Sequence, residues 1–338
     1  MSIAYQVLGA AGRDNAVYVR VLTGKAVHRL LLDCGDGCVT DLSVSEALAV
    51  DHLLFSHLHM DHIGGFDNFF RITYNRAPKP NEVWGPPRTA AIMRHRLRGF
   101  MWNLFEGDPG IWYVNDVHPD RIERTCFKET EAFALAHPAG TRQFDGMLFA
   151  NPDYTVTALS MDHHTPSLAY VIREAPHVNV ATERLDELGL LPGPWLRQLK
   201  QLPPDAPATL TIDGQIREWA ELRAELLVET PGESLAYLTD FLLDEPAVER
   251  LVPALRGCTT VICESQYRSA DEALATRHRH MTGAQAAELA RRAEVGRLIL
   301  FHLSTRYRPA EWRDLLAEAR AIFPSTAFPD HWQVGATE

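Results

Sequence analysis

A histidine-rich segment directly after an apolar run constrains this chain more than any other feature. The run Asp51–Phe55 (DHLLF) is short enough for a buried strand, and His57, His59, Asp61 and His62 follow it within seven residues. Residues two apart in an extended segment point to the same side, so His57 and His59 can converge on one metal ion. Imidazole and carboxylate ligands of this kind suit zinc or a similar divalent cation. An incidental histidine-rich turn is the alternative, and four candidate ligands in six residues disfavour it.

Further candidate ligands also lie directly after predicted strands. They are His163, His164, Asp240 and His302. A carboxylate such as that of Asp240 can bridge two ions, which lie about 3.5–4 Å apart in two-metal sites. Each residue alone is equally well explained as a hydrogen-bonded side chain at a strand end. Their joint recurrence at strand ends indicates a site for two ions.

The pattern of predicted elements changes along the chain. The first half holds short strands with few helices, the later strands reading as antiparallel. The predicted strands are Ala16–Val21, Arg29–Asp33, Asp51–Phe55, Glu131–Ala136, Gln143–Ala150, Tyr154–Ser160 and Ser167–Arg173. The last third alternates strand and helix through Leu235–Thr239, Ala247–Leu255, Thr259–Cys263, Gly283–Ala293, Arg297–Phe301 and Pro309–Ile322. Strands followed by strand–helix units predict an α/β protein with two sheets and helices outside them.

The region Glu174–Glu233 differs from its surroundings. Prolines and glycines interrupt two short predicted helices, Glu183–Leu188 and Trp195–Gln201. The region holds eleven acidic and five basic side chains, a net charge of −6. Its composition predicts an insertion or arm rather than part of the core.

Composition places further limits on the chain. Its 338 residues are 46% hydrophobic and 23% charged, and no apolar stretch approaches the ~20 residues of a membrane span. The net charge of −11 argues against a surface coated in positive potential for nucleic acid. The N-terminus lacks the features of an export signal, and five cysteines without a Cys-x-x-Cys pair indicate buried free thiols. A cytoplasmic location is therefore expected.

At these residues the chain resembles the metallo-β-lactamase superfamily, and within it the tRNase Z (ribonuclease Z) branch that processes tRNA 3′ ends. The matching segments are LLDCGDG (Leu31–Gly37, with Asp33 in the aspartate position), SHLHMDHIGG (Ser56–Gly65), HHTPSLAY (His163–Tyr170), PGPWLRQLK (Pro192–Lys200), YLTD (Tyr237–Asp240), CES (Cys263–Ser265), HMT (His280–Thr282) and LILFHLSTRY (Leu298–Tyr307). The resemblance implies a four-layer αββα sandwich, with residues 1–338 forming one domain and 174–233 an arm-like insertion.

The sequence departs from the family pattern in three places. The loop after the first strand is shortened to LGAAGRDN (Leu8–Asn15). Thr239 replaces the usual glycine before the bridging aspartate, and Phe241 replaces the usual threonine after it.

The resemblance also assigns roles to the candidate site residues. It places one ion on His57, His59 and His163, favouring His163 over His164. It places the second ion on Asp61, His62 and His302, with Asp240 between the two. The ions implied are two Zn²⁺, with Mn²⁺ or Fe²⁺ as alternatives, and the implied assembly is a homodimer.

Three residues are expected to take part in the reaction itself. Asp61 can orient or deprotonate the attacking water. By resemblance, His280 protonates the leaving oxygen and Glu264 orients it. Without the resemblance, His280 reads as a surface residue in the run Arg277–His280. Ser304 and Arg306 are candidate phosphate contacts, because they follow the ligand His302 within four residues.

Three functions remain open at this point. The first is a zinc phosphodiesterase or endoribonuclease acting on tRNA 3′ ends, which the motifs favour. The second is a hydrolase of the same fold acting on a small molecule such as a cyclic nucleotide, an aryl sulfate or a lactone, which the acidic arm favours. A metal-bound scaffold without turnover is the least favoured, because the set of candidate ligands is complete.

Overall fold

A computed structural model describes residues 2–24, 26–76, 79–103, 109–201, 209–212, 214–332 and 334. The described residues form two compact units, divided at Arg173/Glu174 and at Gly232/Glu233. The larger unit contains two mixed β-sheets and the smaller unit contains the segment Glu174–Gly232. The two units are described separately below.

The first sheet has eight strands in chain order. They are β1 (Ser2–Leu8), β2 (Ala16–Leu22), β3 (Val27–Leu32), β4 (His52–Leu54), β5 (Asn81–Gly85), β6 (Ile111–Val117), β7 (Arg121–Lys128) and β8 (His137–Gln143). Strands β3 to β6 are parallel to one another, and the strands at either end pair antiparallel. The carboxyl ends of β3 to β6 therefore share one edge of the sheet.

The second sheet has seven strands in the order β19-β18-β17-β16-β11-β10-β9. They are β9 (Met147–Ala150), β10 (Tyr154–Asp162), β11 (Pro166–Glu174), β16 (Ser234–Leu238), β17 (Thr260–Glu264), β18 (Arg297–Phe301) and β19 (Thr326–Ala327). Strands β16 to β19 are parallel, and β16 pairs antiparallel with β11.

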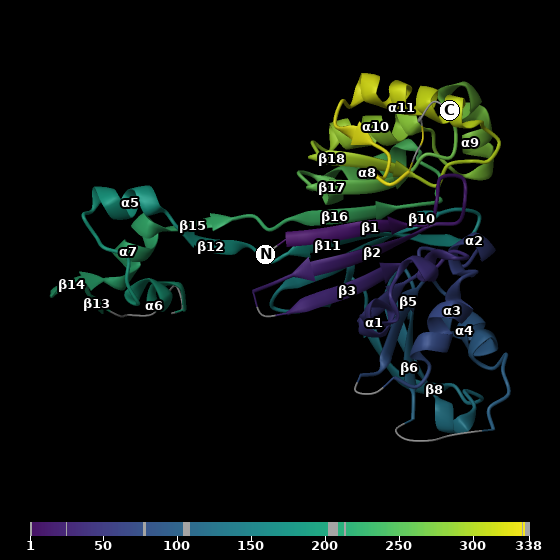
Figure 1. The fold of residues 1–338 in the computed structure, drawn as a ribbon, viewed down its shortest axis with the longest axis horizontal. Helices are drawn as coiled ribbons and strands as arrows, with labels where there is room; N and C mark the ends of the chain where they lie inside the picture. Colours follow the sequence, from purple (N-terminus) through teal and green to yellow (C-terminus); the bar gives the residue numbers. More distant parts are fainter. Residues whose placement is uncertain are drawn as a thin grey trace. The chain divides into compact units, whose positions relative to one another are not determined.

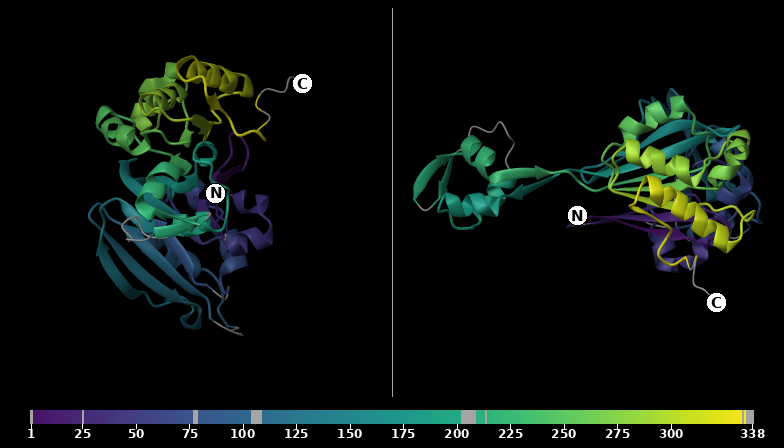
Figure 2. Two further views of the ribbon diagram at one scale, coloured as in Figure 1. Left: turned by 90° about the vertical axis from the view of Figure 1, so that its left-hand side faces the viewer. Right: turned by 90° about the horizontal axis from the view of Figure 1, so that it is seen from above.

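Helices cover the outer face of each sheet, which gives four layers (Figure 1). Those beside the first sheet are α1 (Val44–Ala49), α2 (Met60–Ile63), α3 (Phe66–Thr73) and α4 (Thr89–Leu97), with short 3₁₀ turns at Cys38–Asp41 and Glu129–Glu131. Those beside the second sheet are α8 (Glu245–Leu255), α9 (Glu272–His278), α10 (Gly283–Arg292) and α11 (Pro309–Ile322), with a 3₁₀ turn at Ser269–Asp271. Figure 2 shows α10 and α11 lying side by side.

Alternation along the strands explains why the sheets pack in layers. In β2, Val17, Val19 and Val21 belong to the core shared with the second sheet. Ala16 and Tyr18, on the opposite face, pack into the core beneath α3 and α4. A strand buried on both faces is mostly hydrophobic, as β2 is apart from the exposed Arg20, with its alternate residues divided between two cores. This arrangement confirms the αββα architecture expected from the sequence.

The smaller unit has its own hydrophobic core. Its elements are β12 (His177–Val180), α5 (Thr182–Glu187), α6 (Trp195–Gln201), β13 (Thr209–Ile212), β14 (Gln215–Glu218), α7 (Trp219–Leu226) and β15 (Leu227–Thr230). Two antiparallel pairs form, β12 with β15 and β13 with β14. Trp219 is fully buried and packs with Leu185, Leu199 and Leu222. The unit is therefore a folded module rather than an extended loop.

The strand predicted at Glu131–Ala136 is wrong. A 3₁₀ turn occupies Glu129–Glu131, and Ala132 and Phe133 take left-handed backbone angles (φ of 50° and 54°). Phe133 is fully buried from this turn, where its ring packs against Phe70 and Trp102. Because Phe133 is buried although it lies in a turn, this segment has the apolar spacing that is typical of a strand.

The segment Phe100–Lys128 contributes mainly to the core. It supplies β6 and β7, and Trp112 is fully buried against Phe66 and Phe70. Phe105, an aromatic of this segment, lies outside the described residues. In the part of the chain that the structure describes, no helix is long and apolar enough to cross a membrane.

Close backbone packing at Gly65 gives a testable prediction. A Cβ atom at Gly65 would lie 2.2 Å from the carbonyl oxygen of Gly35, and the Gly65 N–H donates to Cys34 O at 2.9 Å. Gly65→Ala should therefore lower the free energy of unfolding by about 1–3 kcal/mol, measured by denaturant titration. Gly24→Ala is the control, because a Cβ at Gly24 meets nothing within 4 Å. Equal stability of the two variants would contradict this account of the packing.

Candidate metal centre

Strand ends from both sheets bring the predicted ligands together. His57 lies three residues after β4, and His163 directly follows β10. Asp240 lies two residues after β16, and His302 directly follows β18. Since these strand ends meet at one side of the larger unit, side chains far apart in the sequence become neighbours.

The predicted residues gather into two groups whose ligand atoms lie within 4.8 Å of one another. One group holds His57, His59 and His163; the other holds Asp61, His62, Asp240 and His302. His164, in contrast, has an exposed side chain, with Nε2 3.4 Å from the carbonyl oxygen of Arg277. The geometry thus separates His163 from His164, as the resemblance does.

The Asp240 carboxylate lies between the two groups. Its Oδ2 is 3.8 Å from Nε2 of both His57 and His163, and 3.3 Å from Nε2 of His62. Its Oδ1 is 3.4 Å from Nδ1 of His302. The carboxylate therefore faces both groups, as a bridging ligand must.

The two groups fit divalent cations on the chemistry of their donors. Nε2 of His62 is buried and has no hydrogen-bond partner among the described residues, although two carboxylates lie 3.3 Å away. A buried, unsatisfied nitrogen beside carboxylates is costly unless it binds something. A metal ion satisfies both the nitrogen and the carboxylate charge.

Charge in the site has the pattern expected of a cation site. Burial lowers the pKa of His57 well below its usual range and that of His163 to about 4, so both imidazoles are neutral donors. Burial opposes ionisation of Asp61 and Asp240, yet neighbouring imidazoles including His62 and His302 lower the pKa of each carboxyl. The carboxylates are therefore ionised and require positive charge beside them.

Asp33 orients the ligand His62 from behind. The His62 Nδ1–H donates to Asp33 Oδ2 at 2.8 Å, which leaves Nε2 to face the site. The Ser56 N–H and hydroxyl donate to the two oxygens of Asp33 at 2.6 and 2.7 Å, and the Tyr237 hydroxyl donates at 2.7 Å. Asp33 is fully buried. Carboxylates in this position fix the tautomer and orientation of a ligating histidine.

Sequence reasoning did not identify several of these supporting groups. Ser56 and Tyr237 lie one and three residues before predicted ligands, so their position was a usable signal. The Arg279 carbonyl, which accepts from His163 Nδ1–H at 2.8 Å, carried no such signal. Gln266 Nε2 lies 3.3 Å from His302 Nδ1.

His280 lies beside the two groups with Glu264 behind it. The His280 Nδ1–H donates to Glu264 Oε2 at 2.9 Å, and Nδ1 is 3.9 Å from Asp240 Oδ2. Burial opposes protonation, but the Glu264 carboxylate raises the pKa of His280 to about 9. Thr282 caps α10 by accepting from Gln285 N–H, which fixes the chain just after His280.

The predicted phosphate contacts are Arg306 and Ser304. Arg306 is exposed, and its guanidinium lies 5.5 Å from the centre of the Tyr267 ring. The Ser304 hydroxyl accepts from the Arg306 N–H at 3.2 Å. Arg94 and Arg96 donate to carbonyl oxygens of the protein. Their guanidinium groups hold neighbouring loops to α4 and are therefore engaged within the protein.

The departures from the family pattern have visible consequences. Asp240 takes a left-handed backbone angle (φ of 46°), a conformation that is strained for a residue other than glycine. The Thr239 hydroxyl donates to Asp240 Oδ1 at 2.7 Å and so helps to orient the carboxylate. Phe241 is fully buried, and its N–H donates to Glu264 Oε1 at 3.3 Å.

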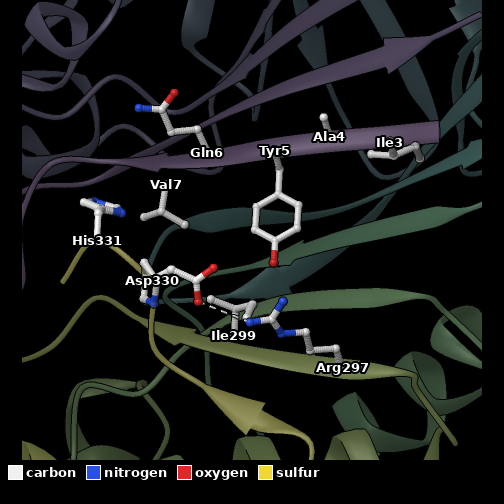
Figure 3. Close-up of a pocket in the computed structure, with 10 residues that line it drawn as sticks. Ile3, Ala4, Tyr5, Gln6, Val7, Arg297, Ile299, Asp330 and His331 are labelled. Atoms are coloured by element: carbon white, nitrogen blue, oxygen red, sulfur yellow. Dashed lines mark hydrogen bonds and ion pairs between the residues drawn. The ribbon is translucent and has the colours of Figure 1, made fainter.

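A cavity of about 530 Å³ lies away from this centre, between β1 and β18. In Figure 3 the Tyr5 ring points from β1 toward Ile299 and Arg297, and Arg297 pairs with Asp330. None of the predicted site residues lines this cavity. The volume of this cavity therefore gives no information about the reaction at the metal centre.

Removing the Asp240 carboxylate should empty both groups of metal. Asp240→Ala is expected to lower bound metal to below about one ion per chain and to abolish hydrolysis, since a shared ligand is lost. Metal content after reconstitution can be measured by elemental analysis. The control is Asp330→Ala, whose side chain is 90% exposed. Full metal content in Asp240→Ala would refute the bridging assignment.

Comparison with known proteins identifies relatives of this chain. The family described as Anti-Pycsar protein Apyc1 matches residues 7–151. Ribonuclease Z of Deinococcus radiodurans is 46% identical over 329 residues, covering 97% of this chain and 98% of that protein.

Solved structures share the fold. The metallo-β-lactamase fold protein YhfI from Bacillus subtilis superposes with a TM-score of 0.58 at 16% identity, covering 97% of this chain and 96% of that one. The short form of human tRNase Z superposes with a TM-score of 0.50 at 17% identity, covering 90% of this chain and 94% of that one. Given the extent of the first match, this chain belongs to the ribonuclease Z family of metal-dependent hydrolases.

Proposed function

We propose that this chain is a two-zinc endoribonuclease that removes 3′ extensions from precursor tRNA. The observation that carries the proposal is the Asp240 carboxylate, which faces two groups of ligands while His280, backed by Glu264, lies on the same side. The relative from Deinococcus radiodurans bears the name ribonuclease Z. Imidazole and carboxylate donors support zinc as the metal.

Each ligand group has a distinct part in this proposal. His57, His59 and His163 would hold one ion, Asp61, His62 and His302 would hold the other, and the Asp240 carboxylate would be shared between them. Bound ions stabilise charge on the phosphoryl oxygens and lower the pKa of an attacking water. Asp61 contacts His62 and His302 through Oδ2, and its side chain is 43% exposed. Its carboxylate can therefore also accept a hydrogen bond from the attacking water.

His280 supplies the proton that the leaving oxygen needs. Its Nδ1–H is engaged by Glu264, so Nε2 is the nitrogen that faces substrate. Glu264 is fully buried and acts as a positioning residue. Because the carboxylate keeps the imidazole protonated, the pair delivers a proton as the phosphorus–oxygen bond breaks.

RNA recognition in this proposal relies on the larger unit. Arg277, Arg306 and Arg308 have exposed side chains near the ends of β18 and α9. Exposed guanidinium groups suit phosphates by charge and shape.

We also propose that residues 174–233 form an insertion within a single domain of 1–338. We propose further that the chain forms a homodimer and that it acts in the cytoplasm. All five cysteines are buried free thiols, as expected in a reducing compartment.

A second candidate function rests on the acidic arm. With a net charge of −6 over Glu174–Glu233, the arm is not attracted to phosphates. A hydrolase of a small phosphodiester would need no such attraction.

Paired assays distinguish the two functions. The zinc-reconstituted protein should cleave precursor tRNA carrying a 3′ trailer, and it should also hydrolyse bis-p-nitrophenyl phosphate. Removal of metal with a chelator should abolish both activities. Hydrolysis of the small diester without any action on precursor tRNA would favour the second function and contradict the first.

The role of His280 can be tested through the leaving group. His280→Ala should lower kcat for precursor tRNA about 100-fold or more, because a ribose alkoxide must be protonated as it leaves. Hydrolysis of bis-p-nitrophenyl phosphate should fall far less, since p-nitrophenolate leaves without a proton. Glu264→Ala should show the same pattern with a smaller loss.

The control for this test is His278→Ala, an exposed neighbour of His280 on the same run. It should retain wild-type rates on both substrates. Equal losses on the two substrates in His280→Ala, with metal content unchanged, would count against proton donation.

A further inference from the structure

A cavity of about 300 Å³ lies beside the metal centre and is not used by the ligands or by His280. Its walls come from the strand ends next to those that carry the metal ligands. Pro87 follows β5, and Val117 is the last residue of β6. Strands β4, β5 and β6 are adjacent and parallel. Their carboxyl ends therefore form a row that begins at the histidines after β4 and continues into the cavity.

The second sheet closes the cavity from the opposite side. Met161 and Asp162 end β10, and His164 and Leu168 lie just beyond the ligand His163. The two histidines of this turn point to different places: His163 faces the metal groups and His164 lines the cavity. The Leu168 N–H donates to Ser56 O at 2.8 Å, directly before His57. One turn thus separates the cavity from the first ligand group.

The lining has the chemistry of a base-binding pocket. Most lining side chains are apolar, and three are prolines, which are Pro87, Pro119 and Pro166. Proline side chains are rigid, so the wall is ordered before a ligand enters. The carboxylate of Asp162 lies at the cavity, where it disfavours a phosphate, and it pairs with Arg279. A flat, neutral ring with polar edges fits this lining better than a charged group does.

We propose that this cavity binds the base of a nucleotide adjoining the scissile phosphate, an inference that rests on the proposed action on RNA. The metal groups hold the phosphate, and the neighbouring base enters the apolar pocket past His164. Ser160 and Thr165 also line the cavity and can hydrogen-bond the base edge. Because most of the contact is apolar, the pocket tolerates different bases and fixes the position of the phosphate.

The test uses precursor tRNAs in which one nucleotide, on either side of the scissile phosphate, lacks its base. Wild-type protein should lose about tenfold in kcat/KM at one of these positions, in keeping with the usual contribution of one base contact. Thr165→Trp fills the cavity, so it should lower kcat/KM for the intact substrate by a similar factor. It should then show no further loss with the abasic substrate.

Two controls separate the cavity from the metal centre and from folding. Thr165→Trp should retain the metal content of the wild-type protein, measured by elemental analysis. Thr141→Trp, at an exposed position on β8, should behave as wild type. A second variant, Pro119→Asp, places a carboxylate in the exposed hairpin turn of the wall, and it should abolish the base dependence without a large change in melting temperature.

Binding gives a readout that does not depend on turnover. A dinucleotide with 2-aminopurine at the sensitive position should change its fluorescence on binding to wild-type protein and should not do so with Pro119→Asp. Cleavage of both abasic substrates at the wild-type rate, or unchanged base dependence in both variants, would overturn the inference. If wild-type protein cleaves no precursor tRNA, the proposed function fails, and the fluorescence measurement alone decides whether the cavity binds a base.

Discussion

The site depends on one buried carboxylate, that of Asp33. It accepts hydrogen bonds from Ser56, His62 and Tyr237, which belong to the β4 end, to α2 and to β16. These contacts join the first sheet to the second at the edge where the ligands meet. A buried carboxylate is costly unless each oxygen is hydrogen-bonded, and here both oxygens are. Satisfying Asp33 therefore requires both sheets to be in place, which couples the fold of the core to the orientation of a metal ligand.

Backbone strain occurs at the same strand ends. Asp33, Asp240 and His302 all take left-handed angles, with φ of 58°, 46° and 54°. For a residue other than glycine such a conformation costs on the order of 1–3 kcal/mol. The surrounding hydrogen bonds and packing offset this cost, and the side chains are turned into the site instead of continuing the strand. The ligands are thus held by the folded core before any ion binds.

The sequence predicted the parts of the site that follow from strand ends. Polar residues after apolar runs predicted His57, His163, His164, Asp240 and His302 as candidate ligands without knowledge of the fold, and the resemblance favoured His163 over His164. The resemblance supplied the roles of Glu264 and His280, which spacing alone did not. Phe133 misled the strand prediction because its burial comes from a turn, and β6 and β7 went unpredicted among the aromatics of their segment. The sheets of the smaller unit were missed because their strands are only four residues long.

The point at which the smaller unit joins the core has an evolutionary consequence. It is inserted between β11 and β16, which pair antiparallel, with Arg173 directly opposite Ser234. The two ends of the insertion are therefore neighbours whatever lies between them, as in a hairpin of any loop length. A lineage can exchange, enlarge or recharge this module while the catalytic core keeps its register. The residues of the metal centre and those of the insertion can therefore change at different rates within one chain.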